Sequence, residues 1–290
     1  MMAPRDAAIP ADERAPTVGR GWQASLALTF GAADARTTLT RRDHRGPLVV
    51  QKPLYPEGHG VCQCIVVHPP GGIAGGDELR LDVTVEAGAH AQLTTPGAAK
   101  WYRAGGRPAY QRTVATIGAS ATLEWMPQGT IVFDGADAAS ELRVDLAADA
   151  TFIGWDVVCL GRTAAAERFA TGTWRQRVDV RRDGALVWSE RAIVRGESAL
   201  LQSRVGLYGA PVFGTFAVMG AGIDDDVLAA CRAVSPMRGE GAVTRLPDAL
   251  VARYRGDASE AGHAYFGHLW SLVRPAVLGR DAVPPRIWRT

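Results

Sequence analysis

The strongest constraint on the fold of this chain is a repeated alternation of apolar and polar residues. The pattern occurs in four segments, at residues 22–30, 78–86, 141–146 and 174–181. In the first of them, Leu26, Leu28 and Phe30 alternate with small or polar residues. Because successive side chains of a β-strand point to opposite faces, each segment is predicted to be a half-buried strand. The recurrence predicts an all-β protein with antiparallel neighbours joined by short loops.

Turn-forming residues separate these segments. The 290 residues include 33 Gly and 17 Pro, which favours many short elements over long helices. No internal linker or shift in composition divides the chain, so we expect one domain over residues 21–290. Residues 1–20 are rich in Ala, Pro and charged residues and contain no apolar run. We expect this segment to be a disordered tail.

Helical periodicity occurs only in the C-terminal half. A short helix is expected after the acidic run 224–226, because carboxylates favour the N-terminal end of the helix dipole. Residues 259–277 carry apolar residues at helical spacing, with Ser259 as the expected cap and Pro275 expected to end or kink the helix. Residues 242–255, with a Pro-Asp pair in their middle, favour a hairpin.

The charge balance and the cysteine content exclude several classes of protein. The formal net charge is +2, from 32 basic and 30 acidic residues, so neither nucleic acid nor an anionic membrane is expected as the main partner. The longest nearly apolar stretch, residues 213–223, is well short of the roughly 20 residues that a membrane-spanning helix needs. Four cysteines do not form a disulfide scaffold, and no secretory signal is recognisable, so a cytoplasmic location is expected.

The glycine-rich run 71–77 suggests a phosphate-binding loop at first sight. That interpretation fails, because such a loop ends in Gly-Lys-Ser/Thr and opens a helix, whereas this run ends in Asp77 and precedes a strand. A carboxylate would also repel phosphate. We therefore expect a glycine turn between strands, with Asp77 held at the turn and facing a cavity or a partner.

Cysteine and histidine side chains are candidate metal ligands. Cys62, Cys64 and His68 lie on one face of an expected strand, and thiolate and imidazole suit a borderline divalent ion. Six residues of strand span about 20 Å, so His68 cannot share an ion with Cys62 unless the chain bends. Core packing is the preferred interpretation of the cysteines. His263 and His268, five apart on the expected helix, point in different directions and cannot share a metal ion. The spacing of the candidate ligands therefore predicts no metal cage.

Several segments of the chain, taken together and in order, carry a family resemblance. They are residues 21–24, 46–48, 53–58, 68–77, 94–102, 123–128, 160–162 and 285–288. This set resembles the urease accessory protein family called UreD, or UreH in some organisms, from about residue 21 to the C-terminus. The motif residues expected to matter structurally are Gly71, Gly72, Gly75, Gly76, Lys100, Tyr102, Pro127, Gln128, Gly161 and Arg162. Gly129 departs from the family pattern, in which an acidic residue often follows Pro-Gln, so it is assigned no role.

The resemblance implies a mostly β fold of a helical or sandwich-like wrapped kind, with mixed sheets and two helices in the C-terminal half. It implies a protein that is not an enzyme. Such a protein joins UreF and the GTPase UreG, and the complex docks on urease apoprotein and assists nickel insertion. A tunnel is thought to pass nickel toward urease. We therefore expect a hetero-oligomer with transient nickel and no tightly bound cofactor.

A conduit needs ligands that release the ion, so scattered carboxylates serve better than a closed cage. The candidate metal-relay residues are Asp77, Asp156 and Glu190. Each has a plainer interpretation. The alternative for Asp77 is that it caps a turn through backbone hydrogen bonds. The alternative for Asp156 is an ion pair with Arg162 or another arginine. For Glu190 the alternative is a cross-strand ion pair.

Two other classes stay open from the residues alone. One is a β-fold hydrolase or isomerase that uses Lys100, Tyr102 and nearby acids, although Lys100 is equally typical of a surface residue beside two aromatics. A deep closed pocket would favour it, and an open-ended tunnel would count against it. The other is a carbohydrate- or peptide-binding module with an exposed aromatic platform of Trp101, Tyr102 and Tyr110.

Overall fold

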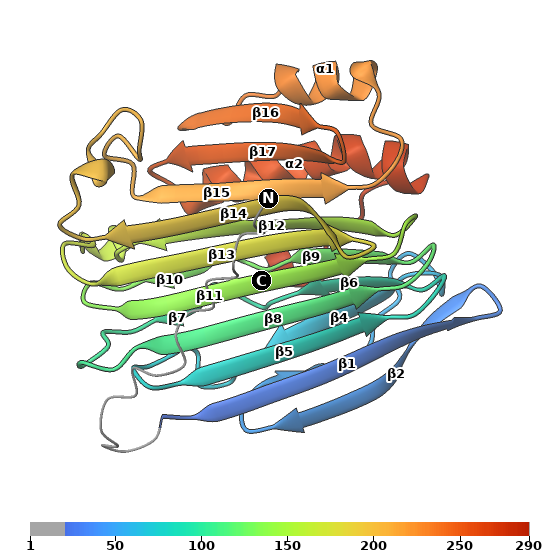
Figure 1. Cartoon of the computed structure of the whole chain (residues 1–290), viewed down its shortest axis with the longest axis horizontal. Helices are drawn as coiled ribbons and strands as arrows, with labels where there is room; N and C mark the ends of the chain where they lie inside the picture. Colours follow the sequence, from blue (N-terminus) through green and yellow to red (C-terminus); the bar gives the residue numbers. More distant parts are fainter. Residues whose placement is uncertain (1–20, 290) are drawn as a thin grey trace, which may run out of the picture.

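Two β-sheets face each other and form most of the molecule (Figure 1). The computed structural model describes residues 21–289, and the expected tail at residues 1–20 lies outside the described residues. The first sheet holds, in spatial order, β14 (Ala185–Arg195), β13 (Thr173–Arg182), β11 (Asp137–Leu146), β8 (Ala109–Ile117), β5 (Glu78–Val85), β1 (Gln23–Ala33) and β2 (Arg36–Arg45).

The second sheet is larger and carries the C-terminal hairpin. Its path runs through β16 (Glu240–Leu246), β17 (Ala249–Gly256), β15 (Val212–Met219), β12 (Thr151–Leu160), β9 (Thr122–Met126), β6 (His90–Thr94), β4 (Cys62–Val67) and β3 (Val49–Val50). Two short strands, β7 (Ala99–Trp101) and β10 (Thr130–Val132), extend it from β12. The expected hairpin at 242–255 is confirmed, since Leu246 pairs with Ala249 around the Pro-Asp turn.

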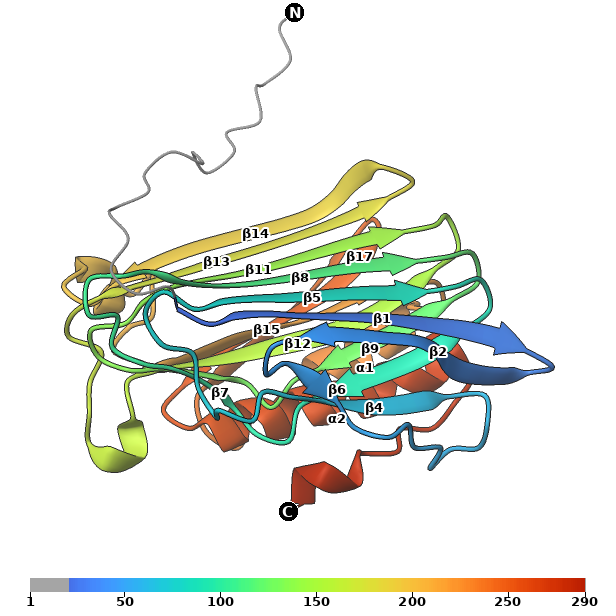
Figure 2. The ribbon, with the colours of Figure 1, turned by 90° about the horizontal axis from the view of Figure 1, so that it is seen from below.

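The chain winds between the two sheets. From β4 to β13 the longer strands alternate between the second sheet and the first, so neighbours within a sheet are separated in the chain by one longer strand of the other sheet (Figure 2). Such neighbours run parallel, as in the pairs β5–β8, β8–β11 and β11–β13. The expectation of antiparallel neighbours is therefore wrong for the middle of the chain, whereas the wrapped, mixed-sheet expectation is confirmed. The alternation of side chains is a local property, and it does not tell which sheet the next strand joins.

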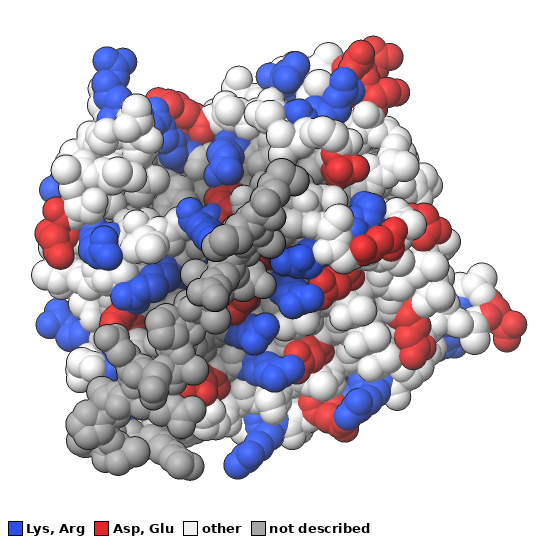
Figure 3. Space-filling view, viewed as in Figure 1, with Lys and Arg blue, Asp and Glu red and all other residues white. Residues whose placement is uncertain are grey.

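The predicted alternation places the apolar side chains between the sheets. Leu26, Leu28 and Phe30 of β1 are each at most 1% exposed, and the apolar residues of β5 are buried in the same core. The outer face of the first sheet carries the polar positions. There basic and acidic side chains interleave (Figure 3) and pair along single strands, as Arg80 and Asp82 do at 2.6 Å.

Two helices lie in the C-terminal half, as expected. α1 (Asp225–Ala233) begins after Asp224, whose carboxylate accepts a hydrogen bond from the Val227 amide at 2.9 Å. α2 (Ser259–Leu278) covers the outer face of the second sheet (Figure 2). β12 is thus buried on both faces, with Phe152 toward the first sheet and Trp155 toward α2. Among residues 21–289, no helix is long and apolar enough to cross a membrane.

The span of α2 agrees with the expected 259–277 to within one residue, but the roles of two of its residues differ from the expectation. Ala258 is the N-terminal cap and contributes no side-chain hydrogen bond, so Ser259 is the first helical residue and not the cap. Pro275 does not end the helix, which continues to Leu278. The stop comes from Gly279, whose left-handed backbone lets its N–H reach the Pro275 carbonyl at 2.9 Å.

Three short 3-10 turns complete the described chain. They are Thr163–Ala165, Ala199–Leu201 and Arg286–Arg289. The last turn brings Trp288 against Trp155 and Trp270, with ring centroids 5.4 and 6.0 Å away. Its indole N–H donates to the Thr94 hydroxyl at 2.8 Å, which fixes the C-terminal segment to the end of β6.

Candidate functional site

A cavity of about 440 Å³ lies between the two sheets and is lined by strands of both. Its polar lining residues include His68, Thr95, Gln111, Thr113, Ser140, Asp156, Gln176, Glu190 and Thr215. Its wall also includes the segment 95–100, in which Pro96, Gly97 and Lys100 are exposed. The cavity therefore meets the surface at this segment.

A rung of polar side chains crosses the first sheet inside the cavity. Ser140 of β11 is in register with Gln111 of β8 and with Gln176 of β13, and all three line the cavity. Gln176 occupies an inward-facing position in a strand whose other inward residues are apolar. A buried polar side chain needs a hydrogen-bond partner, and this one finds it on the opposite sheet.

Asp156 is the partner of Gln176. The Gln176 amide donates to its Oδ2 atom at 2.9 Å. Burial raises the pKa of Asp156 to about 6, and the nearby charge of Glu190 acts in the same direction. The alternative pairing of Asp156 with Arg162 does not form, because Asp156 faces the cavity while Arg162 follows the end of β12 and pairs with Glu167 at 2.6 Å.

Glu190 reaches the same region from the opposite sheet. Its carboxylate accepts hydrogen bonds from the Thr215 hydroxyl, at 3.1 and 3.3 Å, and from the guanidinium of Arg253 at 2.9 Å. Thr215 is in register with Asp156, so the two carboxylates lie at one level of the cavity. The ion pair expected for Glu190 exists, but it joins two sheets and not two strands of one sheet. Within its own sheet Glu190 lies opposite Val178.

Asp77 does not line this cavity. Both of its carboxylate oxygens accept backbone N–H groups at 2.8 Å, one from Trp22 and one from Ala74. The surrounding turn is tight, because a Cβ atom at Gly75 would lie 1.9 Å from the Ala104 carbonyl oxygen. The geometry is that of the turn-capping alternative, and it separates Asp77 from the other two carboxylates.

The cysteines and histidines do not assemble into a metal cage. Cys62 and Cys64 are fully buried in the core between the sheets. Within residues 21–289, no group of three or more His, Cys, Asp or Glu side chains is arranged to hold a metal ion. His263 is half-buried beside the backbone of Gln128, and this burial lowers its pKa to about 4, whereas His268 is exposed.

His68 lines the cavity, and its Nε2 atom is buried without a hydrogen-bond partner. Burial lowers its pKa despite the opposing charge of Asp77. The imidazole is therefore neutral at physiological pH.

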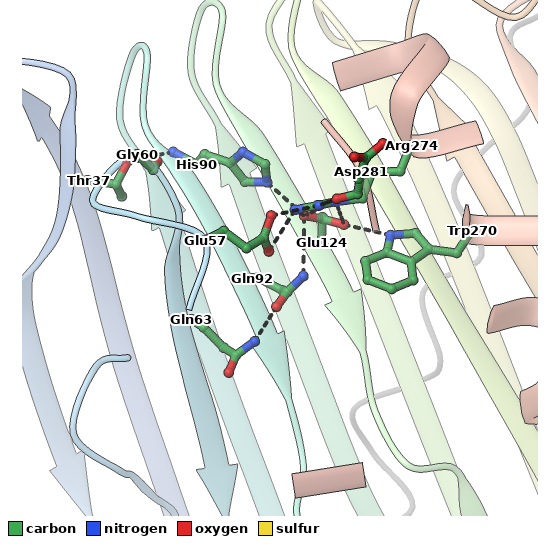
Figure 4. Close-up of polar contacts among 10 residues, drawn as sticks. All are labelled: Thr37, Glu57, Gly60, Gln63, His90, Gln92, Glu124, Trp270, Arg274 and Asp281. Carbon is green, nitrogen blue, oxygen red and sulfur yellow. Dashed lines mark hydrogen bonds and ion pairs between the residues drawn. The ribbon is translucent and has the colours of Figure 1, made fainter. Parts of the chain in front are cut away.

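A second polar cluster, which periodicity did not predict, lies under α2 (Figure 4). Glu124 of β9 is fully buried and accepts hydrogen bonds from Trp270 at 2.7 Å and Arg274 at 3.0 Å, and it contacts His90 at 2.7 Å. Arg274 also pairs with Glu57 at 2.7 Å. Although burial acts in the opposite direction, His90 and Arg274 hold the pKa of Glu124 below its usual value. The cluster fastens α2 to the second sheet.

Comparison with known proteins identifies the family. The family model for the UreD urease accessory protein matches residues 23–289. The chain belongs to the UreD family. It is 54% identical over 271 residues to the urease accessory protein UreD of Azoarcus sp. (strain BH72), with 93% of this chain and 95% of the relative covered. It is 51% identical over 282 residues to UreD of Dechloromonas aromatica (strain RCB), with 95% and 97% covered.

The UreD motif segments meet where the cavity reaches the surface. Gly71, Gly72, Lys100 and Pro127 all line it, although they are far apart in the sequence. Gly72 has no room for a side chain, because a Cβ atom would lie 2.3 Å from the Tyr102 ring. The backbone N–H of Gln128 donates to the Thr95 hydroxyl at 2.9 Å, and the Trp155 indole donates to the Pro127 carbonyl at 2.9 Å.

The other UreD motif residues lie at turns. Gly76 and Gly161 have the positive φ angles that favour glycine, 93° and 83°. Arg162 pairs with Glu167 and lies over the Phe133 ring, 4.7 Å from its centroid.

The aromatic platform suggested for a carbohydrate- or peptide-binding module does not form. Trp101 is only 1% exposed and packs edge-on against Trp174, with ring centroids 5.3 Å apart. Tyr102 and Tyr110 are partly exposed, but without Trp101 they do not make the expected three-ring surface. The alternation of strand residues explains the difference, since Trp101 of β7 faces the core and its neighbours do not.

Proposed function

We propose that this chain acts in urease maturation as a scaffold and nickel conduit, without a catalytic step of its own. One observation carries the proposal: Asp156 and Glu190, from opposite sheets, face the same internal cavity. Family membership supports the link to urease, because the relatives carry the name urease accessory protein. In this proposal the chain works in the cytoplasm with UreF, the GTPase UreG and urease apoprotein.

The chemistry of the cavity suits transient binding of a divalent ion. Two carboxylates, the amide of Gln176 and the hydroxyl of Thr215 supply oxygen ligands. Oxygen ligands hold nickel less tightly than a set of thiolates or imidazoles. A site of this kind binds an ion and releases it, as a conduit must.

The three candidate relay residues have separate roles in this proposal. Asp156 and Glu190 form the relay. Asp77, whose oxygens are occupied by backbone N–H groups, holds the turn next to the cavity. His68, with a buried Nε2 atom that lacks a partner, is an additional donor on the cavity wall.

The test is co-expression of the double variant Asp156→Asn, Glu190→Gln with urease apoprotein, UreF and UreG. We expect the nickel content of purified urease, measured by elemental analysis, to fall severalfold while the accessory complex elutes unchanged in size exclusion. Glu240→Gln is the matched control, since Glu240 is an exposed carboxylate that pairs with Arg255 outside the cavity. Full nickel loading by the double variant would overturn the conduit.

A further inference from the structure

The ion pair of Glu190 and Arg253 lies at the boundary between the cavity and the solvent. Glu190 lines the cavity and its side chain is 14% exposed, whereas the side chain of Arg253 is 57% exposed. The pair also crosses from β14 of the first sheet to β17 of the second, near the top of Figure 1. The guanidinium therefore meets the cavity carboxylate from the solvent side.

A small surface hollow adjoins the cavity at this point. It has a volume of about 160 Å³ and is lined by Trp188, Ala242, Thr244, Leu246, Val251 and Arg253. Trp188 lines both the hollow and the cavity. Arg253 lines the hollow and bonds a residue of the cavity, so its side chain occupies the boundary between the two spaces. The hollow gives the guanidinium space to move away from Glu190.

A divalent ion can bind Glu190 fully only if Arg253 moves away, because the charge of Arg253 already neutralises that carboxylate. Asp156 and Glu190 carry two negative charges when ionised, and their hydrogen-bond partners Gln176 and Thr215 are neutral. Arg253 supplies one positive charge. A divalent ion neutralises both carboxylates by itself, so ion and guanidinium compete for Glu190.

We propose that Arg253 is a tethered counter-cation that gates the cavity. It holds Glu190 when no metal ion is bound and swings into the hollow when a divalent cation takes that carboxylate. When Arg253 returns to Glu190, it helps to release the ion. This inference rests on the proposed function, and it adds a gate and a second opening at the hollow, which is lined by other residues than the segment 95–100. The Arg253 side of the pair is exposed, so solvent screens the pair and it is weak enough to be exchanged.

The test measures binding of Ni²⁺ to the purified full chain by equilibrium dialysis. Arg253→Gln removes the competing charge, so we expect nickel to bind about twofold to fivefold more tightly, the range that an exposed ion pair accounts for. Arg253→Lys keeps a positive charge and should return the affinity most of the way to that of the unaltered chain. Arg245→Gln is the matched control. Arg245 lies on β16, the strand next to β17, and the substitution removes the same charge from an exposed pair with Asp225 of α1.

The outcomes separate the gate from the conduit. If Arg253→Gln binds nickel no more tightly than Arg245→Gln, or if the Lys variant gains as much as the Gln variant, the gate is wrong. Glu190→Gln reports on the conduit itself and should weaken binding. Unchanged binding by Glu190→Gln would overturn both the conduit and its gate, whereas weaker binding beside an inert Arg253→Gln would overturn the gate alone. Thermal unfolding of each variant identifies any loss of fold, and Arg253→Lys then carries the test.

Discussion

Gln176 of β13 donates a hydrogen bond of 2.9 Å to the carboxylate of Asp156 of β12, and so joins two strands that lie in different sheets. The bond aims a carboxylate into an internal cavity and satisfies an amide that would otherwise be buried without a partner. Glu190 makes the corresponding contact from the first sheet to Thr215 and Arg253 of the second. The polar centre of the molecule thus also connects its two layers.

Removal of the Gln176 side-chain amide is predicted to lower the stability of the fold. Gln176→Ala leaves the Asp156 carboxylate without its donor, and we expect the free energy of unfolding to fall by about 1–3 kcal/mol. Chemical denaturation at neutral pH measures the change. Glu197→Gln, on an exposed loop position, should change it by less than about 0.5 kcal/mol. Equal losses in the two variants would contradict the role of the inter-sheet bond.

Asp156 is predicted to make stability depend on pH. Its folded pKa of about 6 lies above the value of about 3.9 in an unfolded chain, so the folded protein holds this proton more tightly. The stabilising contribution is complete below pH about 4 and is lost as the pH rises through about 6. Asp156→Asn should therefore stabilise the protein at about pH 8 by up to about 3 kcal/mol, with no gain at about pH 4.

Denaturant titrations of Asp156→Asn and of the unaltered chain at several pH values measure this difference. Glu197→Gln serves as the exposed control. The physical account requires the gain from Asp156→Asn to shrink as the pH falls. A gain that is the same at pH about 4 and pH about 8 would show that the carboxyl is not held protonated by its surroundings.

The cluster under α2 is predicted to be sensitive to the loss of its one arginine. Arg274→Met leaves Glu124 buried without its ion pair, which should cost about 3–5 kcal/mol of unfolding free energy. Arg41→Met, which breaks an exposed pair with Asp43, should cost no more than about 1 kcal/mol. Thermal and denaturant unfolding of both variants compares them. A mild effect at Arg274 would mean that Glu124 finds another partner.

In the turn that Asp77 caps, replacement of Gly75 by a residue with a side chain is predicted to destabilise the protein. Gly75→Ala places a Cβ atom 1.9 Å from a backbone oxygen, so backbone must shift, and we expect a loss of about 1–3 kcal/mol or more. Gly97→Ala meets nothing within 4 Å and should be close to neutral. Melting temperatures of the two variants decide the point, and similar values would contradict the tight turn.

Some of the fold could be predicted from local patterns. Alternation identified the inward faces of β1 and β5, and the acidic run at 224–226 located α1. The direction of strand pairing could not be predicted in this way, because it depends on the winding of the chain between two sheets. The extent of α2 was predicted to within one residue, but its stop was assigned to Pro275, whereas Gly279, with its left-handed backbone, follows the last helical residue.

The site was predictable only in part. Asp156 and Glu190 were chosen on a family resemblance, and they do line one cavity. The partners of Glu190, Thr215 and Arg253, are distant in the sequence, and nothing local indicates which carboxylate they meet. Gln176 did leave a signal, since it is polar at a position where the alternation of β13 calls for an apolar residue.

The most direct test of the central claim is to locate nickel in crystals of the full chain equilibrated with Ni²⁺, by anomalous diffraction at the nickel absorption edge. The account predicts a peak inside the cavity between Asp156 and Glu190, which weakens in crystals of the Asp156→Asn, Glu190→Gln variant. A peak of equal height in that variant, or nickel bound only outside the cavity, would contradict the account.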